Sequence, residues 1–235
     1  MPIHLVHVSP HEIVVVKPAG LVCELPRNPM ADSLVRRLAY EGYPGLRLVH
    51  RLDAPACGLM LIARSAAAAA HFSREIEARR WHKWYVARVS RPFQSSDPLI
   101  GTHKVHLRTE GRTARVVRAG GRPAILDVVT SAPVPGSTDG ADLLIRLHTG
   151  RFHQIRATLA HLGAPLTGDR VYGGPSAPRL YLEQVLLAAR TFAGPAWRVW
   201  QAPSHPDRPA WHGDLARAVE RHAAALGAAL FAAPS

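Results

Sequence analysis

The sequence has few cysteines and no long hydrophobic run. Its two cysteines, Cys23 and Cys57, form no CxxC pair, which argues against a disulfide scaffold and against a cysteine-rich zinc site. No apolar stretch approaches the roughly 18 residues that cross a bilayer. The first twelve residues also lack the basic and apolar segments of a secretory signal. These absences predict a cytoplasmic protein that does not enter a membrane.

Acidic residues are scarce as well. The chain has 17 Asp and Glu against 29 Lys and Arg, a formal net charge of +12. The excess concentrates in residues 64–91 and 104–122, two segments that could follow a phosphate backbone. RNA, DNA or an anionic membrane surface are therefore the natural candidates for a partner. A solvated basic face on an arginine-rich chain is the alternative that charge alone leaves open.

Fourteen histidines raise the question of a metal site. His103 and His106 have HxxH spacing, but they lie in a probable loop or strand and have no neighbouring carboxylate of the zincin type. We find no complete ligand set in the sequence and predict no metal.

The local patterns predict an α+β fold with a mixed, mainly antiparallel sheet and flanking helices. With 235 residues, 47% of them apolar, the chain can form one domain over 1–235 with a substantial core. The residues 186–192 fit a helix or a strand. Predicted strands are 12–17, 58–63, 83–89, 124–129 and 142–148, and predicted helices are 66–80, 153–162 and about 214–231.

Asp53 is the acidic residue that most needs an explanation. It stands two residues after Arg51 in an arginine-rich chain, and in an extended stretch these two side chains point the same way. A nearby positive charge keeps a carboxyl group ionised. The residues alone leave two roles open, a structural ion pair and a catalytic carboxylate, and they favour the ion pair.

Four segments resemble the motifs of the RluA-type pseudouridine synthases, in that family's order and roughly its spacing. They cover most of residues 10 to 175. They are 14–21 (VVVKPAGL), 50–63 (HRLD, then GLMLIA), 83–89 (KWYVARV) and 150–173 (GRFHQIR, then LGAPLTGDRVYG).

The resemblance implies the pseudouridine synthase fold and an isomerase that converts uridine to pseudouridine in rRNA or tRNA, without cofactor or metal. By that resemblance Asp53 acts on the target uridine, Tyr85 lies against the uracil, and Arg156 pairs with Asp53. Arg51 helps evict the target nucleotide, which must leave its stack before the glycosidic bond can be reached. The further residues matching its substrate-binding positions are His50, Arg151, His153 and Gln154.

The chain also departs from the family pattern. Ala56 and Cys57 replace the usual Thr-Ser, Phe152 replaces a Thr, and Leu187 replaces a common histidine. We expect no S4-like RNA-binding domain before the catalytic domain, and a monomer. A non-catalytic RNA-binding protein on the same fold is the alternative. A nucleic-acid hydrolase is disfavoured, because the sequence offers no second candidate acid and no set of metal ligands.

Overall fold

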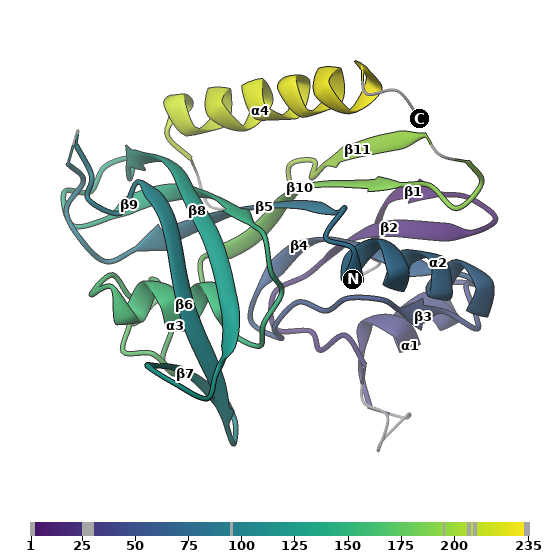
Figure 1. Ribbon diagram of the computed structural model, residues 1–235, viewed down its shortest axis with the longest axis horizontal. Coiled ribbons are helices and arrows are strands. Elements are labelled where there is room, and N and C mark those ends of the chain that lie inside the picture. Colours follow the sequence, from purple (N-terminus) through teal and green to yellow (C-terminus); the bar gives the residue numbers. More distant parts are fainter. Residues whose placement is uncertain are drawn as a thin grey trace. The chain divides into compact units, whose positions relative to one another are not determined.

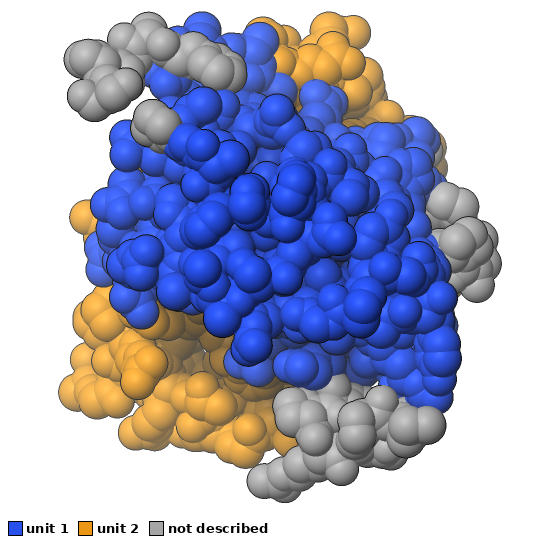
Figure 2. Space-filling view, turned by 90° about the vertical axis from the view of Figure 1, so that its right-hand side faces the viewer, with its two compact units in different colours: residues 1–81, 183–208, 223–235 blue, residues 82–182, 209–222 orange. Residues whose placement is uncertain are grey.

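The computed structural model describes residues 3–24, 31–94, 96–194, 196–205, 208 and 211–232. Its helices and strands are labelled in Figure 1. The chain divides into two compact units, which Figure 2 colours separately. Unit 1 comprises residues 1–81, 183–208 and 223–235, and unit 2 comprises 82–182 and 209–222. Among the described residues, no helix combines the length and the apolarity that crossing a membrane requires.

Unit 1 is built on strands that pair mostly antiparallel. β2 pairs with β1 and β4, β3 pairs with β4, and β11 pairs with β10, all antiparallel, whereas β10 runs parallel to β4. These strands are β1 (His4–Val8), β2 (Glu12–Lys17), β3 (Arg47–Leu48), β4 (Cys57–Ala63), β10 (Leu182–Arg190) and β11 (Trp197–Gln201). The first residue of β10, Leu182, is assigned to unit 2.

The core of unit 1 surrounds β2 and β4, and every residue of these two strands is buried. Their continuous apolar runs, rather than an alternating pattern, reflect burial on both faces. α2 (Ala66–Glu77) packs Phe72 into this core, and Ser65 caps the helix by accepting a hydrogen bond from the Ala68 amide. α1 (Leu34–Tyr40) is capped in the same way by Ser33.

Gly58 allows β4 and β10 to approach each other closely. A Cβ atom at this position would stand 2.4 Å from the backbone oxygen of Gln184, and the residue has φ +110°. Both observations require glycine, because an L side chain would clash and would disfavour this backbone. The glycine that opens the GLMLIA segment is therefore explained by packing.

Unit 2 contains an antiparallel sheet with the strand order β5-β9-β8-β6-β7. α3 (Gln154–His161) packs against β6 and β7, where Ala157 joins a small apolar cluster with Leu107. The strands are β5 (His82–Val89), β6 (Gly101–Glu110), β7 (Thr113–Val117), β8 (Arg122–Pro133) and β9 (Ala141–Leu147). α4 (Gly213–Ala232) has residues 213–222 in unit 2 and the rest in unit 1.

The predicted α+β class with a mixed, mainly antiparallel sheet is confirmed, and β10 with β4 supplies a parallel pair. The ambiguous residues 186–192 are mostly strand, within β10, and the predicted C-terminal helix is α4. The prediction missed the short elements α1, β1, β3 and β11. It also missed β6 and β7, whose polar residues interrupt any apolar run. The assignment of 1–235 to one domain stays a prediction.

Candidate functional site

Asp53 lies in unit 1, half-buried in the loop between β3 and β4. A turn forms around it, in which the Ala56 amide donates to the Asp53 carbonyl at 3.1 Å. The thiol of Cys23 donates to the carbonyl of Leu52 at 3.2 Å, and the Gly20 amide donates to that of Ala54 at 2.8 Å. The loop that carries the carboxylate is therefore held on both sides of Asp53, at Leu52 and at Ala54, by hydrogen bonds from residues 20–23.

Lys17, at the end of β2, anchors the same loop. Its side chain is fully buried, and its ammonium group donates to the carbonyls of Pro18 (2.8 Å), Leu21 (2.8 Å) and Ala54 (3.0 Å). A buried charge is tolerated only where it is well hydrogen-bonded, and three carbonyl oxygens provide this here. No role for Lys17 was predicted from the sequence; its place in the VVVKPAGL segment was the available signal.

The two predicted substrate-binding residues beside Asp53 differ in their surroundings. Arg51 is exposed. His50 packs its ring edge-on against Trp81, with centroids 5.1 Å apart, and its Nε2 accepts a hydrogen bond from the Leu61 amide at 3.0 Å. This contact gives His50 a structural role on β4, and its contact with substrate stays a prediction.

Tyr85 lies in unit 2 on β5, where it is buried opposite Ile145 of β9. Lys83 precedes it by two residues and so shares its face of the strand. Burial lowers the pKa of Lys83 to about 8. A Cβ atom on Gly150 would stand 3.5 Å from the Lys83 Nζ, so this ammonium group lies beside the loop that leads into α3.

Gln154 organises that loop. Its side-chain oxygen accepts hydrogen bonds from the Thr149 hydroxyl (2.9 Å) and the Arg151 amide (3.0 Å), and its amide nitrogen donates to the carbonyl of Ile125 (3.1 Å). Arg151 in turn donates through Nε to the carbonyl of Pro123 at 3.1 Å. Because Gln154 is buried and bonded in this way, its geometry fits a residue that shapes the loop; substrate binding by it stays a prediction.

His153 begins α3 in a left-handed backbone conformation, with φ 51° and ψ 26°. Non-glycine residues seldom adopt it, and it persists where surrounding contacts hold it. Arg156 Nη1 lies 3.0 Å from His153 Nε2, and His153 Nδ1 lies 3.0 Å from the Tyr172 hydroxyl. Since a guanidinium group only donates, Nε2 accepts and the ring proton is on Nδ1.

Arg156, on the first turn of α3, forms a buried bidentate ion pair with Asp169. Its Nε and Nη2 atoms each lie 2.7 Å from a different carboxylate oxygen. Gly168 permits the turn that presents Asp169, because it has φ +83° and a Cβ there would overlap the Arg179 carbonyl oxygen at 1.8 Å. Asp169 lies within the fourth motif, but no role was predicted for it; a lone acid among arginines was the available signal.

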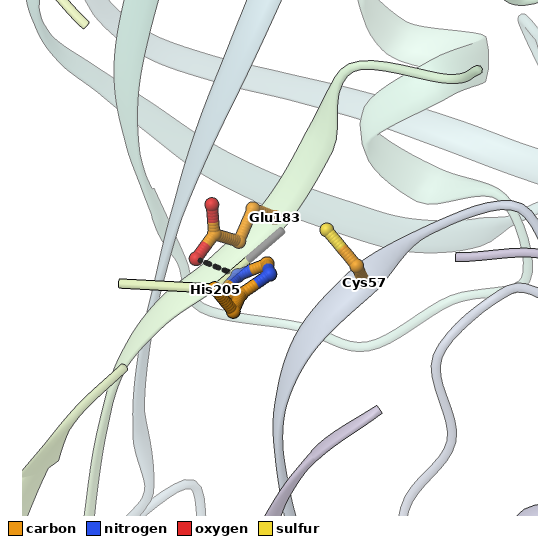
Figure 3. Close-up of side chains that lie close together, drawn as sticks. All are labelled: Cys57, Glu183 and His205. Carbon is orange, nitrogen blue, oxygen red and sulfur yellow. Dashed lines mark hydrogen bonds and ion pairs between the residues drawn. The ribbon is translucent and has the colours of Figure 1, made fainter. Parts of the chain in front are cut away.

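One described cluster combines three metal-ligand types. Cys57 on β4 and Glu183 on β10 are register partners, and His205 joins them so that the three ligand atoms lie within 4.8 Å of one another (Figure 3). Glu183 accepts from His205 Nε2 at 2.9 Å and from Arg208 Nη2 at 2.6 Å. Arg208 is paired with this carboxylate, and its positive charge disfavours the binding of a metal cation at the same site. The absence of a metal stays a prediction.

The predicted site residues thus fall into two groups. His50, Arg51 and Asp53 share one loop of unit 1. In unit 2, a second group gathers at the start of α3 (Arg151, His153, Gln154 and Arg156), and Tyr85 stands on β5.

A family model and two relatives that match this chain are all described as pseudouridine synthases. A family model described as RNA pseudouridylate synthase matches residues 11–161. Ribosomal large subunit pseudouridine synthase D of Xanthomonas campestris pv. campestris is 32% identical over 179 residues, covering 74% of this chain and 53% of that protein. The dual-specificity RNA pseudouridine synthase RluA of Escherichia coli (strain K12) is 31% identical over 192 residues, covering 80% and 85%. The chain spans just over half the length of several of the D-type relatives it matches.

Two solved structures share the fold. Human RNA Pseudouridylate Synthase Domain Containing 1 superposes with a TM-score of 0.69 at 22% identity, over 93% of this chain and 94% of that one. Human RNA Pseudouridylate Synthase Domain Containing 4 gives 0.64 at 20% identity, over 86% and 88%. At these identities the similarity concerns the fold.

Proposed function

The chain belongs to the RNA pseudouridylate synthase family, and from this premise we propose that it isomerises uridine to pseudouridine in RNA. The family match includes Asp53, Tyr85 and Arg156. The relatives' names support the activity, and those of the D type support rRNA as substrate. The name of the dual-specificity relative supports more than one kind of RNA target, and we propose tRNA as the alternative to rRNA. We further propose that the chain acts in the cytoplasm as a monomer, with 1–235 as one catalytic domain.

The anchoring of Asp53 is the observation that carries this proposal. A carboxylate facing a polyanion is electrostatically unfavourable and needs a function to justify its place. Here the loop of that carboxylate is held by the buried ammonium of Lys17 and by the Cys23 thiol. Such support from the surrounding protein keeps a reacting group in a fixed geometry.

The reaction breaks the N-glycosidic bond of the target uridine, turns the uracil and rejoins it to C1′ through C5. No redox change or group donor is needed. Asp53 is the carboxylate that acts on the uridine, and Arg156 pairs with it and orients it. Tyr85 lies against the uracil ring and acts as the base that takes the C5 proton once C5 is bonded to C1′. N1, which has lost its bond to C1′, gains a proton, so the isomerisation is balanced overall. Arg51, exposed on the Asp53 loop, contacts the flipped nucleotide or fills the place it leaves.

The experiment uses purified protein, EDTA, unmodified total tRNA and rRNA fragments. Pseudouridine is read by mass spectrometry after nuclease digestion and by carbodiimide-dependent stops in reverse transcription. We expect stops at specific uridines with the wild type and none with Asp53→Asn, which should still bind RNA in a salt-sensitive manner. Asp139→Asn removes the same charge from an exposed loop and should keep full activity.

Other outcomes would identify other functions. RNA that binds without modification would indicate the non-catalytic protein on the same fold, and shortened RNA would indicate a nuclease. Loss of both binding and turnover in Asp53→Asn would show that Asp53 is structural.

A further inference from the structure

Phe152 is a large aromatic residue that stays exposed at the start of α3. Of its surface, 46% is accessible to solvent. Its ring stacks on that of His153, with centroids 3.8 Å apart and planes inclined by 21°. Adjacent side chains in extended backbone point in opposite directions, and the left-handed φ of His153 is what brings these two rings together. The outcome is a pair of stacked rings.

The ring beneath Phe152 is fixed on both of its nitrogens. Arg156 donates to Nε2 of His153, while Nδ1 contacts the hydroxyl of Tyr172. That hydroxyl also accepts from the Ala114 amide at 2.8 Å. Arg156 is itself held by the buried carboxylate of Asp169. Hydrogen bonds from α3, from β7 and from the turn of Asp169 and Tyr172 thus hold the His153 ring on which Phe152 stacks.

The surroundings of Phe152 are cationic. Arg151 precedes it directly and is tied to the carbonyl of Pro123, next to the exposed Arg122 of β8. Arg170 is exposed in the turn between Asp169 and Tyr172. The acid of this turn, Asp169, is buried in its ion pair with Arg156 and offers little negative charge to a ligand. Phe152 therefore presents an apolar face on a part of unit 2 whose neighbouring segments carry exposed positive charges.

We propose that Phe152, backed by His153, is a stacking platform for an unpaired nucleobase of the RNA. This inference rests on the proposed RNA substrate and adds a base-binding position to it. Every nucleobase has a flat face that stacks on an aromatic ring, while nearby arginines contact the phosphates. Phe152 stands where the family pattern has a Thr, so the platform would distinguish this chain from relatives that keep the smaller residue.

The test measures RNA affinity for a series of substitutions at one position. Phe152→Ala removes the ring, Phe152→Leu keeps apolar bulk without a π face, and Phe152→Tyr keeps the ring. Phe93→Ala, at an exposed phenylalanine elsewhere in unit 2, is the matched control. Equilibrium binding is followed by fluorescence anisotropy of the RNA fragment that the wild type retains, and stacking by quenching of 2-aminopurine placed at successive positions.

We expect Kd to rise about tenfold for Phe152→Ala and Phe152→Leu, within the range measured for single base-aromatic stacks. Phe152→Tyr and Phe93→Ala should stay within about twofold of the wild type. The dependence of log Kd on log salt should keep its slope, because no phosphate contact is lost. One 2-aminopurine position should lose its quenching in the Ala and Leu variants only.

Wild-type affinity in Phe152→Leu, or an equal loss in Phe93→Ala, would overturn the platform. So would a salt slope reduced by about one, which would assign the effect to phosphate contacts. The proposed function fails separately, if the wild type forms no pseudouridine on any RNA. In that case, a tenfold loss of affinity would still support the platform, now on an RNA-binding protein.

Discussion

Arg156 and Asp169 form a buried ion pair, with two hydrogen bonds of 2.7 Å between the guanidinium group and the carboxylate. The two residues are 13 positions apart, on α3 and on the turn that follows it. Bidentate geometry fixes the plane of a guanidinium group as well as its position. Asp169 is therefore a positioning residue for the arginine that we propose to orient the catalytic carboxylate.

Asp169→Asn should reduce both stability and turnover. Removing one partner of a buried ion pair costs roughly 3–5 kcal/mol, since the other charge is left buried and uncompensated. We expect the free energy of unfolding in urea to fall by about that amount, and kcat to fall at least tenfold under conditions where the variant is folded. Asp142→Asn breaks the buried pair with Arg88 and is the matched control: it should lose stability and keep kcat. Equal kcat losses in the two variants would contradict a specific role for Asp169.

Lys17→Met should damage the Asp53 loop. The substitution keeps a long apolar stem but leaves three carbonyl oxygens without the ammonium group that they accept from. Unsatisfied buried acceptors cost about 1–3 kcal/mol each, less what is recovered by removing a buried charge. We expect unfolding to become easier by roughly 2–4 kcal/mol. We also expect kcat to fall while the Kd for RNA is unchanged. Lys104→Met, at an exposed lysine of β6, should leave the free energy of unfolding and kcat unchanged.

Lys83 should make stability depend on pH in the alkaline range. Burial lowers its pKa from 10.5 to about 8. Below pH 8 the ammonium is charged in the folded and the unfolded chain, and its burial in the folded chain has a cost in stability. Between pH 8 and 10.5 the unfolded chain binds a proton that the folded chain does not, so stability rises with pH.

The corresponding measurement compares the wild type with Lys83→Met in urea at a series of pH values. The wild type should gain stability relative to this variant as the pH rises from 7 to 11, by up to about 3 kcal/mol. Comparing the two cancels the other groups that titrate in this range. The wild type compared with Lys104→Met should show no such gain, and a flat difference for Lys83→Met would show that its ammonium is not destabilised by burial.

Chelation should leave turnover unchanged. The Cys57, Glu183 and His205 cluster has metal-ligand types, but the carboxylate is already paired with Arg208. Dialysis against EDTA and then a metal-free assay should retain at least about 80% of kcat, and elemental analysis should find less than about 0.1 zinc per chain, as expected for a site without a complete ligand set. Loss of activity that zinc restores, and that Cys57→Ser abolishes, would make this cluster a metal site.

The sequence determined the elements whose signal is local. The β-branched run EIVVVK predicted β2 at its observed bounds, and the predicted helix 66–80 begins at the residue where α2 begins. The motifs singled out Asp53 and Arg156 for the same reason, because their neighbours along the chain carry the pattern. Propensity, periodicity and capping act over a few residues, which is the range that a sequence shows directly.

The tertiary structure decided what depends on distant partners. β6 has a single buried residue, Leu107, and becomes a strand by pairing with β7 and β8. Lys17 reaches the carbonyl of Ala54 across 37 positions, and Asp169 reaches Arg156 across 13. Which buried donor meets which acceptor follows from strand order and close approach, not from the residues on either side of it. The sequence therefore identified the candidate catalytic residues, and only the fold showed what holds them in place.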